Sequence, residues 1–140
     1  MLIQASAVAI EGRALILEGP SGSGKSSLAL ALIDRGATLI GDDGVALARE
    51  GSRVLASPPP NIAGLLEIRG VGLVTLPTVA DMPLALILSL VGEGHAERLP
   101  GRLVTRDFFG VPIPVLPFAP GTIAPALRTE WALRQHGLAL

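Results

Sequence analysis

A short stretch of the chain, GPSGSGKSS at Gly19–Ser27, combines three glycines with the only lysine of the sequence. It matches the pattern G-x-x-x-x-G-K-[ST] without a mismatch, and it lies between a run typical of a strand and a run typical of a helix. A glycine-rich loop in this context can bring consecutive backbone N–H groups close to several negative charges. The stretch therefore predicts a binding site for the phosphates of a nucleoside triphosphate.

The side chains of this loop suggest separate roles in triphosphate binding. Lys25 is expected to reach the β- and γ-phosphates, and the Ser26 hydroxyl is placed to ligate Mg²⁺. The helix that follows adds the positive end of its dipole. A flexible glycine-serine turn that happens to contain a lysine is the alternative. The predicted nucleotide-binding residues are Gly19, Pro20, Ser21, Gly22, Ser23, Gly24, Lys25, Ser26 and Ser27.

Two adjacent carboxylates, Asp42 and Asp43, follow the next apolar run of the sequence. In an open α/β sheet, ligands bind beyond the carboxyl ends of the strands, which is where these acids are expected. Such acids could ligate Mg²⁺ or take a proton from an attacking hydroxyl. Neighbours on a strand point to opposite faces, so the two acids are expected to differ in role. The sequence DDG also favours a tight turn, which is the alternative interpretation.

The segments around these motifs predict strands and helices in the order that such a site requires. Residues 5–10 and 14–18 are short and apolar, which indicates two paired strands, the second leading into the glycine loop. The next helix is expected to begin at Ser26 and to end near Gly36, where a left-handed cap belongs. Further strands are predicted at residues 37–40, 45–48, 53–56, 82–92 and 111–116.

Three consecutive prolines at residues 58–60 are expected to break regular structure. The segment IAGLLEIRG at 62–70 is then predicted to form one or two helical turns. A strand is predicted to follow at 71–76.

The last helix is predicted over about Thr122 to His136. Ile123, Leu127 and Trp131 recur at every fourth position, which places them on one apolar face. Such a face is typical of a helix packed against a core.

The composition indicates one domain. A chain of 140 residues with 49% hydrophobic residues can bury a substantial core around one site, so residues 1–140 are interpreted as a single domain. The net charge of −1 without a basic block gives no electrostatic reason to expect nucleic acid. The absence of cysteine excludes disulfides and thiolate metal sites.

No membrane association is expected. The longest apolar run, Met82–Gly92, is about half of the roughly 20 residues that a spanning helix needs. The N-terminus lacks the positive region of a signal peptide, so a cytoplasmic location is expected.

The segment LLEIRGVGLV at Leu65–Val74 resembles the signature of the HPr serine kinase/phosphorylase family. The preceding SPPPNIAG at 57–64 and the segment LIDRGATLIGDDGVAL at 32–47 are also similar to that family, and the motifs follow in the same order. The resemblance implies an α/β, P-loop kinase-like domain with a mixed β-sheet, of the HPr kinase C-terminal domain type. It also implies the shortened form of the family, in which residues 1–140 are the catalytic domain.

The activity that the resemblance implies is ATP- and Mg²⁺-dependent phosphorylation of a serine on the phosphocarrier protein HPr. Phosphorolysis of the phosphoserine by inorganic phosphate, which yields pyrophosphate, is implied as the reverse reaction. Carried over by position, Asp42 would accept the serine proton and Asp43 would support the metal. Glu67 would hold the cation together with Ser26.

Two arginines complete the site that the resemblance implies. Arg69 would stabilise the site or position phosphate, and Arg98 would stabilise the transferring charge together with Lys25. The alternative interpretations are that Glu67 and Arg69 form a surface pair and that Arg98 is a solvated loop residue. The resemblance further implies a homo-oligomer, a hexamer in this family.

The sequence departs from the family pattern at two places. Gln4 stands where the family commonly has a histidine, and an amide cannot act as an acid or base, so phosphorylation is better supported than dephosphorylation. The loop APGTIA at 119–124 lacks the basic residues that the family often has there. Two other hypotheses therefore stay open: a nucleotide- or phosphate-sensing module without turnover, and a small-molecule kinase.

Overall fold

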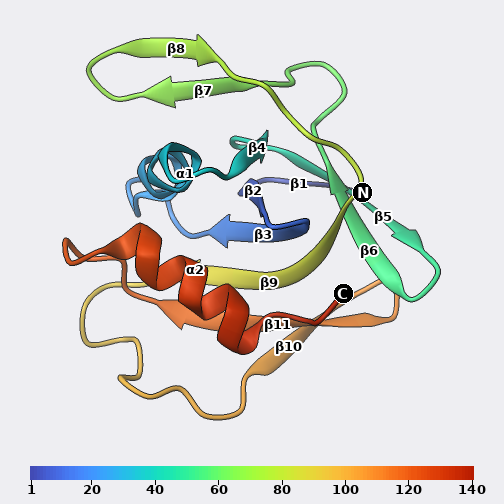
Figure 1. Cartoon of the computed structure of the whole chain (residues 1–140), viewed down its shortest axis with the longest axis vertical. Helices are drawn as coiled ribbons and strands as arrows, with labels where there is room; N and C mark the ends of the chain where they lie inside the picture. Colours follow the sequence, from blue (N-terminus) through green and yellow to red (C-terminus); the bar gives the residue numbers. More distant parts are fainter.

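The computed structural model describes residues 1–140 and is built on a curled nine-stranded sheet, a separate two-stranded hairpin and two helices (Figure 1). This arrangement confirms the predicted α/β class with a mixed sheet. The strands are β1 Leu2–Ile3, β2 Ser6–Ile10, β3 Arg13–Glu18, β4 Thr38–Gly41, β5 Val45–Glu50, β6 Arg53–Ser57, β7 Leu65–Ile68, β8 Gly72–Thr75, β9 Met82–Leu90, β10 Val104–Phe108 and β11 Val111–Phe118, and the helices are α1 Lys25–Asp34 and α2 Pro125–His136.

The strand order explains why the sheet curls. The main path runs β1-β5-β6-β9-β3-β2-β4, and β11 joins β9 and carries β10. β1 and β2 lie far apart in this order although only Gln4 and Ala5 separate them in the chain. The sheet must therefore bend back on itself, which wraps β5 and β6 around one side of the core.

The ends of three neighbouring strands meet at one edge of the sheet. β2 is antiparallel to both β3 and β4, so β3 and β4 run in the same direction on either side of it. The carboxyl ends of β3 and β4 and the amino end of β2 consequently meet at the same edge. The glycine loop leaves β3 there, and the two adjacent aspartates leave β4 there.

Two apolar layers lie on opposite faces of the sheet, because side chains alternate along each strand. On β3, Ala14 and Ile16 belong to a cluster enclosed by the curled strands, whereas Leu15 and Leu17 belong to a cluster that includes residues of α1 and α2. All four of these side chains are at most 1% exposed. β3 is thus a rigid support for the loop that follows it.

The predicted elements from β2 to β6 are confirmed with boundaries shifted by one or two residues. α1 begins at Lys25 and ends at Asp34, and Gly36 adopts a left-handed φ of 111° just after it. The predicted strands at 82–92 and 111–116 are also confirmed, as β9 and β11.

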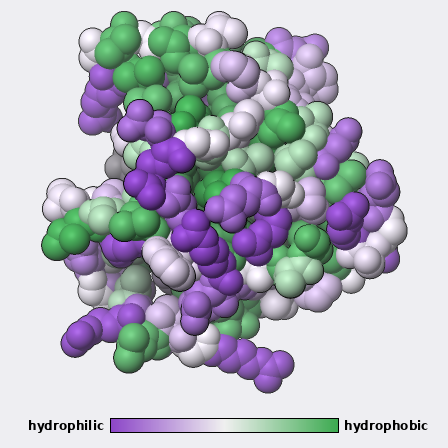
Figure 2. Space-filling view, in the orientation of Figure 1, coloured by the Kyte–Doolittle hydropathy of each residue, from purple (hydrophilic) through white to green (hydrophobic).

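The prediction of helical turns at 62–70 is wrong, because this segment forms β7, which pairs with β8 in a hairpin; the strand predicted at 71–76 is confirmed as β8. Leu66 is fully buried between exposed Leu65 and Glu67, which is the period-two pattern of a strand. Gly70 turns the chain with a φ of 79°. The hairpin lies over α1, and Figure 2 shows apolar side chains at its end of the molecule, where Val71 and Leu73 are exposed.

The apolar face predicted for the last helix exists, but it points outward. Ile123 precedes α2 and is 80% exposed, and Trp131 is 58% exposed. The face turned to the protein holds Ala126, Thr129, Glu130 and Leu133. This face includes an ion pair between Glu130 and Arg35 at 2.9 Å, whose hydrogen bond raises the pKa of Arg35, so hydropathy alone assigned the wrong side.

Neither helix is long and apolar enough to cross a membrane.

Candidate active site

The glycine loop forms a cradle at the amino end of α1. Gly24 is the N-cap of this helix with a left-handed φ of 97°, a conformation that glycine adopts without a steric penalty. No side chain caps the helix and its first turn holds no acidic residue. The N–H groups of the first turn therefore remain available to an anion, and the helix dipole favours one there.

Lys25 spans the loop from which it arises. Its Nζ donates hydrogen bonds to the carbonyl oxygens of Gly19, at 2.7 Å, and Pro20, at 3.4 Å. Gly19 has no room for a larger side chain, since a Cβ atom there would lie 2.7 Å from the Ser23 Oγ. The loop is thus closely packed beneath the lysine ammonium group.

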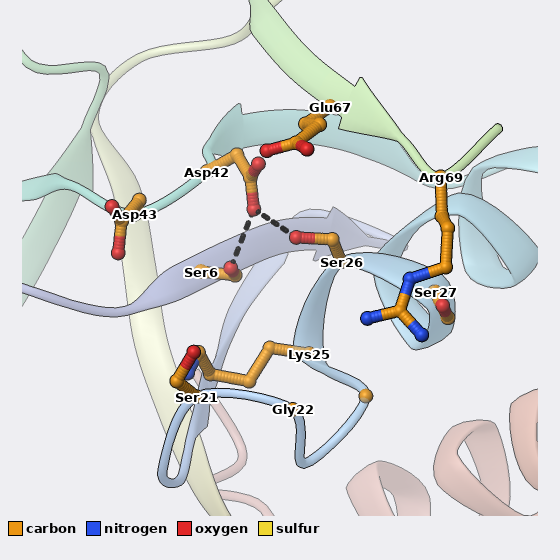
Figure 3. A pocket seen from close by; sticks show the side chains of 11 residues that line it. Ser6, Ser21, Gly22, Lys25, Ser26, Ser27, Asp42, Asp43, Glu67 and Arg69 are labelled. Carbon is orange, nitrogen blue, oxygen red and sulfur yellow. Dashed lines mark hydrogen bonds between the residues drawn. The ribbon is translucent and has the colours of Figure 1, made fainter. Parts of the chain in front are cut away.

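A cavity of about 340 Å³ opens above this loop, and no hydrophobic residue lines it. Residues of the glycine loop and α1 line one side, and residues of β2, of the turn that follows β4 and of the β7–β8 hairpin line the others (Figure 3). The lining residues are Ser6, Ser21, Gly22, Gly24, Lys25, Ser26, Ser27, Asp42, Asp43, Glu67 and Arg69. Such a lining suits a charged ligand and not the apolar body of a small molecule.

The two adjacent aspartates occupy different environments. The Oδ1 atom of Asp42 accepts two hydrogen bonds of 2.8 Å, one from the Oγ of Ser26 and one from the Oγ of Ser6. Figure 3 shows the Asp42 carboxylate pointing between these two hydroxyls. Asp43 is exposed, has a left-handed φ of 61°, and its carboxylate makes no hydrogen bond within the protein. One acid is held in place and the other is free.

The β7–β8 hairpin brings a carboxylate and a guanidinium to the cavity. Glu67 lies on the side of Asp42, whereas Arg69 extends toward Ser27 and the start of α1 (Figure 3). No salt bridge joins Glu67 to Arg69. Both charges therefore remain available to a ligand.

The oxygen atoms of the cavity fit a magnesium ion bound together with a substrate. The chain contains no group of three or more His, Cys, Asp or Glu side chains that could hold a metal by themselves. Mg²⁺ commonly takes only one or two protein carboxylates and completes its shell with water and substrate phosphate oxygens. The Ser26 hydroxyl and the carboxylates of Asp42 and Glu67 are hard oxygen donors of that kind.

An ion pair fixes the strand that leads into the loop. Arg106 on β10 donates hydrogen bonds to both carboxylate oxygens of Glu18, the last residue of β3, at 2.5 and 2.8 Å. These hydrogen bonds raise the pKa of Arg106. The bidentate geometry holds the end of β3 against β10, immediately before the first glycine of the loop.

The structure brings most of the predicted site residues to this cavity, but not all. Gly19, Pro20 and Ser23 belong to the glycine loop without lining the cavity, and Ser23 Oγ is buried without a hydrogen-bond partner. Arg98 is exposed in the loop between β9 and β10, and it does not line the cavity. The catalytic role predicted for Arg98 stays a prediction.

Ser6 is the cavity residue that the sequence analysis missed. It opens the otherwise apolar strand SAVAI, where a polar residue at the start of a strand carries little information by itself. Its position becomes meaningful only because β2 lies between β3 and β4. The feature that could have indicated Ser6 is a small hydroxyl residue on β2, the strand that precedes β3 and the glycine loop.

Comparison with known proteins identifies the family. The model of the HPr Serine kinase C-terminal domain matches residues 1–122. The HPr kinase/phosphorylases of Bordetella pertussis and Burkholderia cenocepacia are each 40% identical, over 73% and 74% of this chain and 37% and 35% of their own lengths. The chain thus spans little more than a third of these relatives. The solved structure of the HPr(Ser) kinase/phosphatase from Coxiella burnetii matches with a TM-score of 0.86 and 28% identity, over 97% of this chain and 95% of that one. The protein belongs to the HPr serine kinase C-terminal domain family.

Proposed function

We propose that residues 1–140 form one catalytic domain that transfers the γ-phosphoryl group of ATP to a serine of an HPr-type phosphocarrier protein. The observation that carries this proposal is the polar cavity in which a glycine loop, a lysine and two unlike carboxylates meet. The names of the relatives support HPr as the acceptor. A homo-oligomer, with a hexamer as the expected form, is part of the proposal.

The glycine loop would bind the phosphate chain. The free N–H groups at the start of α1 and the ammonium group of Lys25 would neutralise the β- and γ-phosphates, and Arg69 would approach from the hairpin. Mg²⁺, held by Ser26, Asp42 and Glu67, would supply charge neutralisation between the phosphates. Catalysis would then consist mainly of positioning and electrostatic stabilisation.

The geometry favours an exchange of the roles first expected for the two aspartates. Asp42 shares its Oδ1 with the hydroxyl of Ser26, the predicted metal ligand, so it is committed to the metal side of the cavity. Asp43 is exposed and makes no internal hydrogen bond, so its carboxylate can reach an incoming hydroxyl. We therefore assign the proton-accepting role to Asp43 and the metal-supporting role to Asp42.

In the forward reaction, the serine hydroxyl oxygen would attack the γ-phosphorus. The new O–P bond forms while the bond to the β,γ-bridging oxygen breaks, so ADP leaves with the electron pair and the serine proton passes to Asp43. In the phosphorolytic reaction, an oxygen of inorganic phosphate would attack the phosphoserine phosphorus. Pyrophosphate would form as the bond between phosphorus and the serine oxygen breaks, and Asp43 would take the proton of the attacking phosphate and pass it to the leaving serine oxygen.

The test is transfer from γ-labelled ATP to purified HPr with Mg²⁺. Label on a serine of HPr is the expected result, and loss of this label when inorganic phosphate is added would demonstrate the phosphorolytic reaction in addition. ATP binding without transfer to HPr would contradict the kinase assignment and favour the sensing module. Transfer to a small molecule but not to HPr would favour a small-molecule kinase.

The polar lining of the cavity predicts that the protein discriminates only weakly between nucleotide bases. Because no hydrophobic residue lines the cavity, the base has no apolar slot there, and ATP and GTP should differ in kcat/KM by less than about fivefold. Initial rates of HPr phosphorylation with each nucleotide would measure this ratio. A preference for ATP of a hundredfold would show that a base site exists elsewhere on the protein.

Substitutions of Arg69 and Arg98 are expected to affect different steps, nucleotide binding in one case and phosphoryl transfer in the other. Arg69→Ala should weaken binding of a non-hydrolysable ATP analogue by about tenfold, because a charge-assisted contact in the cavity is lost. Arg98→Ala should leave this affinity unchanged and lower only the rate of transfer to HPr, since Arg98 lies outside the cavity. Calorimetric titration of both variants tests the difference, and an equal loss of affinity in both would contradict it.

A further inference from the structure

Ser6 is one of only three buried polar or charged residues in the chain, together with Thr129 and Glu130. Thr129 donates to the Pro125 carbonyl oxygen within α2, and Glu130 pairs with Arg35, so both serve the packing of that helix. Ser6 instead donates its hydroxyl proton to Asp42 in the cavity. Its partner is thus a residue of the proposed metal site.

Packing does not explain a hydroxyl at this position. Ser6 is 0% exposed, and the next residues of β2, from Ala7 to Ile10, are all apolar and buried. In the sheet, Ser6 pairs with Leu17 on β3, and Ala7 pairs with Gly41 on β4. This register sets Ser6 beside the residue that follows Gly41, which is Asp42. A buried alanine would fill this place without a polar group that needs a partner.

The two hydroxyls that meet at Asp42 differ in what they can do. Ser26 lies at the start of α1, and its proton points to Asp42 Oδ1, which leaves its oxygen lone pairs free for a cation. Ser6 is buried beneath the carboxylate and donates to the same Oδ1. Two donors on one oxygen fix the rotation of the carboxylate, while Oδ2 makes no hydrogen bond within the protein.

We propose that Ser6 is a positioning residue that orients the Asp42 carboxylate for the metal ion, acting through Asp42 without touching the ion. The inference rests on the proposed function, because it takes the cavity to be a metal-nucleotide site. Partners that orient metal ligands from behind typically change metal affinity by tenfold or more when they are removed. Ser6 would therefore control metal affinity, and the transfer step at saturating metal would change little.

The test is a Mn²⁺ titration of the full chain saturated with a non-hydrolysable ATP analogue, in which the EPR signal reports free Mn²⁺. Ser6→Ala is expected to weaken Mn²⁺ binding by about tenfold. In the HPr assay, the same variant should raise the Mg²⁺ concentration needed for half-maximal rate, with kcat at saturating Mg²⁺ within about threefold of the native value. This split distinguishes a positioning role from a general loss of structure.

Two further variants keep the test decisive. Thr129→Val removes the hydroxyl of the other fully buried serine or threonine, and it should leave Mn²⁺ affinity unchanged. Ser6→Cys nearly preserves the volume of the side chain but offers only a weak donor, so it should weaken Mn²⁺ binding as Ser6→Ala does. If Ser6→Ala does not fold, which circular dichroism would show, Ser6→Cys carries the test.

The outcomes separate the failure of this inference from the failure of the proposed function. If the native protein adds no Mn²⁺ binding to that of the free nucleotide analogue, the metal-nucleotide site itself is wrong, and the role of Ser6 falls with it. If the native protein binds Mn²⁺ and a folded Ser6 variant binds it equally well, only the role of Ser6 is wrong. An equal loss in Thr129→Val would also overturn it.

Discussion

Asp43→Asn is expected to lower the rate of phosphoryl transfer to HPr by about 10²- to 10⁴-fold, the usual contribution of a general base. Asparagine is close in size and tolerates the left-handed φ of 61° at this position, so the backbone should not change. Asp43 makes no hydrogen bond to the loop or to Ser26, so affinity for the ATP analogue should stay the same. Single-turnover transfer and calorimetric titration measure the two quantities separately.

Asp42→Asn is the matched control for this prediction. The amide oxygen can still accept the hydroxyl protons of Ser6 and Ser26, but the negative charge beside the proposed cation is lost. This variant should need more Mg²⁺ for half-maximal rate. If instead Asp42→Asn abolishes transfer at saturating Mg²⁺ while Asp43→Asn remains active, Asp42 is the base and the present assignment is reversed.

Gly41→Ala is expected to be the most destabilising small substitution near the site. A Cβ atom at Gly41 would lie 2.0 Å from the carbonyl oxygen of Gly44 and 3.3 Å from Cδ of Pro59, so the turn from 41 to 44 would have to move. Overpacking of this kind costs on the order of 3 kcal/mol, or roughly 10 °C in melting temperature. Because Asp42 and Asp43 lie in this turn, Mn²⁺ affinity should fall as well.

Gly101→Ala is the control for backbone clearance. A Cβ atom at Gly101 would have no atom within 4 Å, and the residue lies in an exposed loop. Its free energy of unfolding should change by less than about 0.5 kcal/mol. Thermal unfolding of the two variants under the same conditions makes the comparison, and equal melting temperatures would show that the turn from 41 to 44 adapts to a methyl group.

The glycine loop and the aspartate pair could be predicted from the sequence because their information is local. In each case, residue types at fixed spacing carry the chemistry, and an apolar run next to them marks the strand. The helix α1 was predictable for the same reason, since good helix formers are followed by Gly36 in the left-handed conformation that ends many helices.

The elements that failed depend on contacts between distant parts of the chain. The outward face of α2 could not be foreseen, because the inward face is held by Glu130, whose partner Arg35 lies at the end of α1. The role of Ser6 needs the insertion of β2 between β3 and β4, which no local pattern specifies. The hairpin β7–β8 failed for a different reason. Buried Leu66 between exposed Leu65 and Glu67 is an alternation of only three residues, and a sequence this short fits a helical turn as well as a strand.

The attachment of the β7–β8 hairpin has a consequence for the construction of the site. The hairpin is not part of the main sheet: Leu76 N donates to Gly64 O and closes its base, and just beyond it Val79 N donates to Leu39 O on β4. One side of the cavity is thus made of the glycine loop, the start of α1, Ser6 and the aspartate turn, and the other side is made of the hairpin, which carries Glu67 and Arg69. Displacing the hairpin would carry Glu67 and Arg69 away from the phosphate cradle and expose Leu66, whereas the glycine loop and Asp42 would keep their supports on β3 and β4.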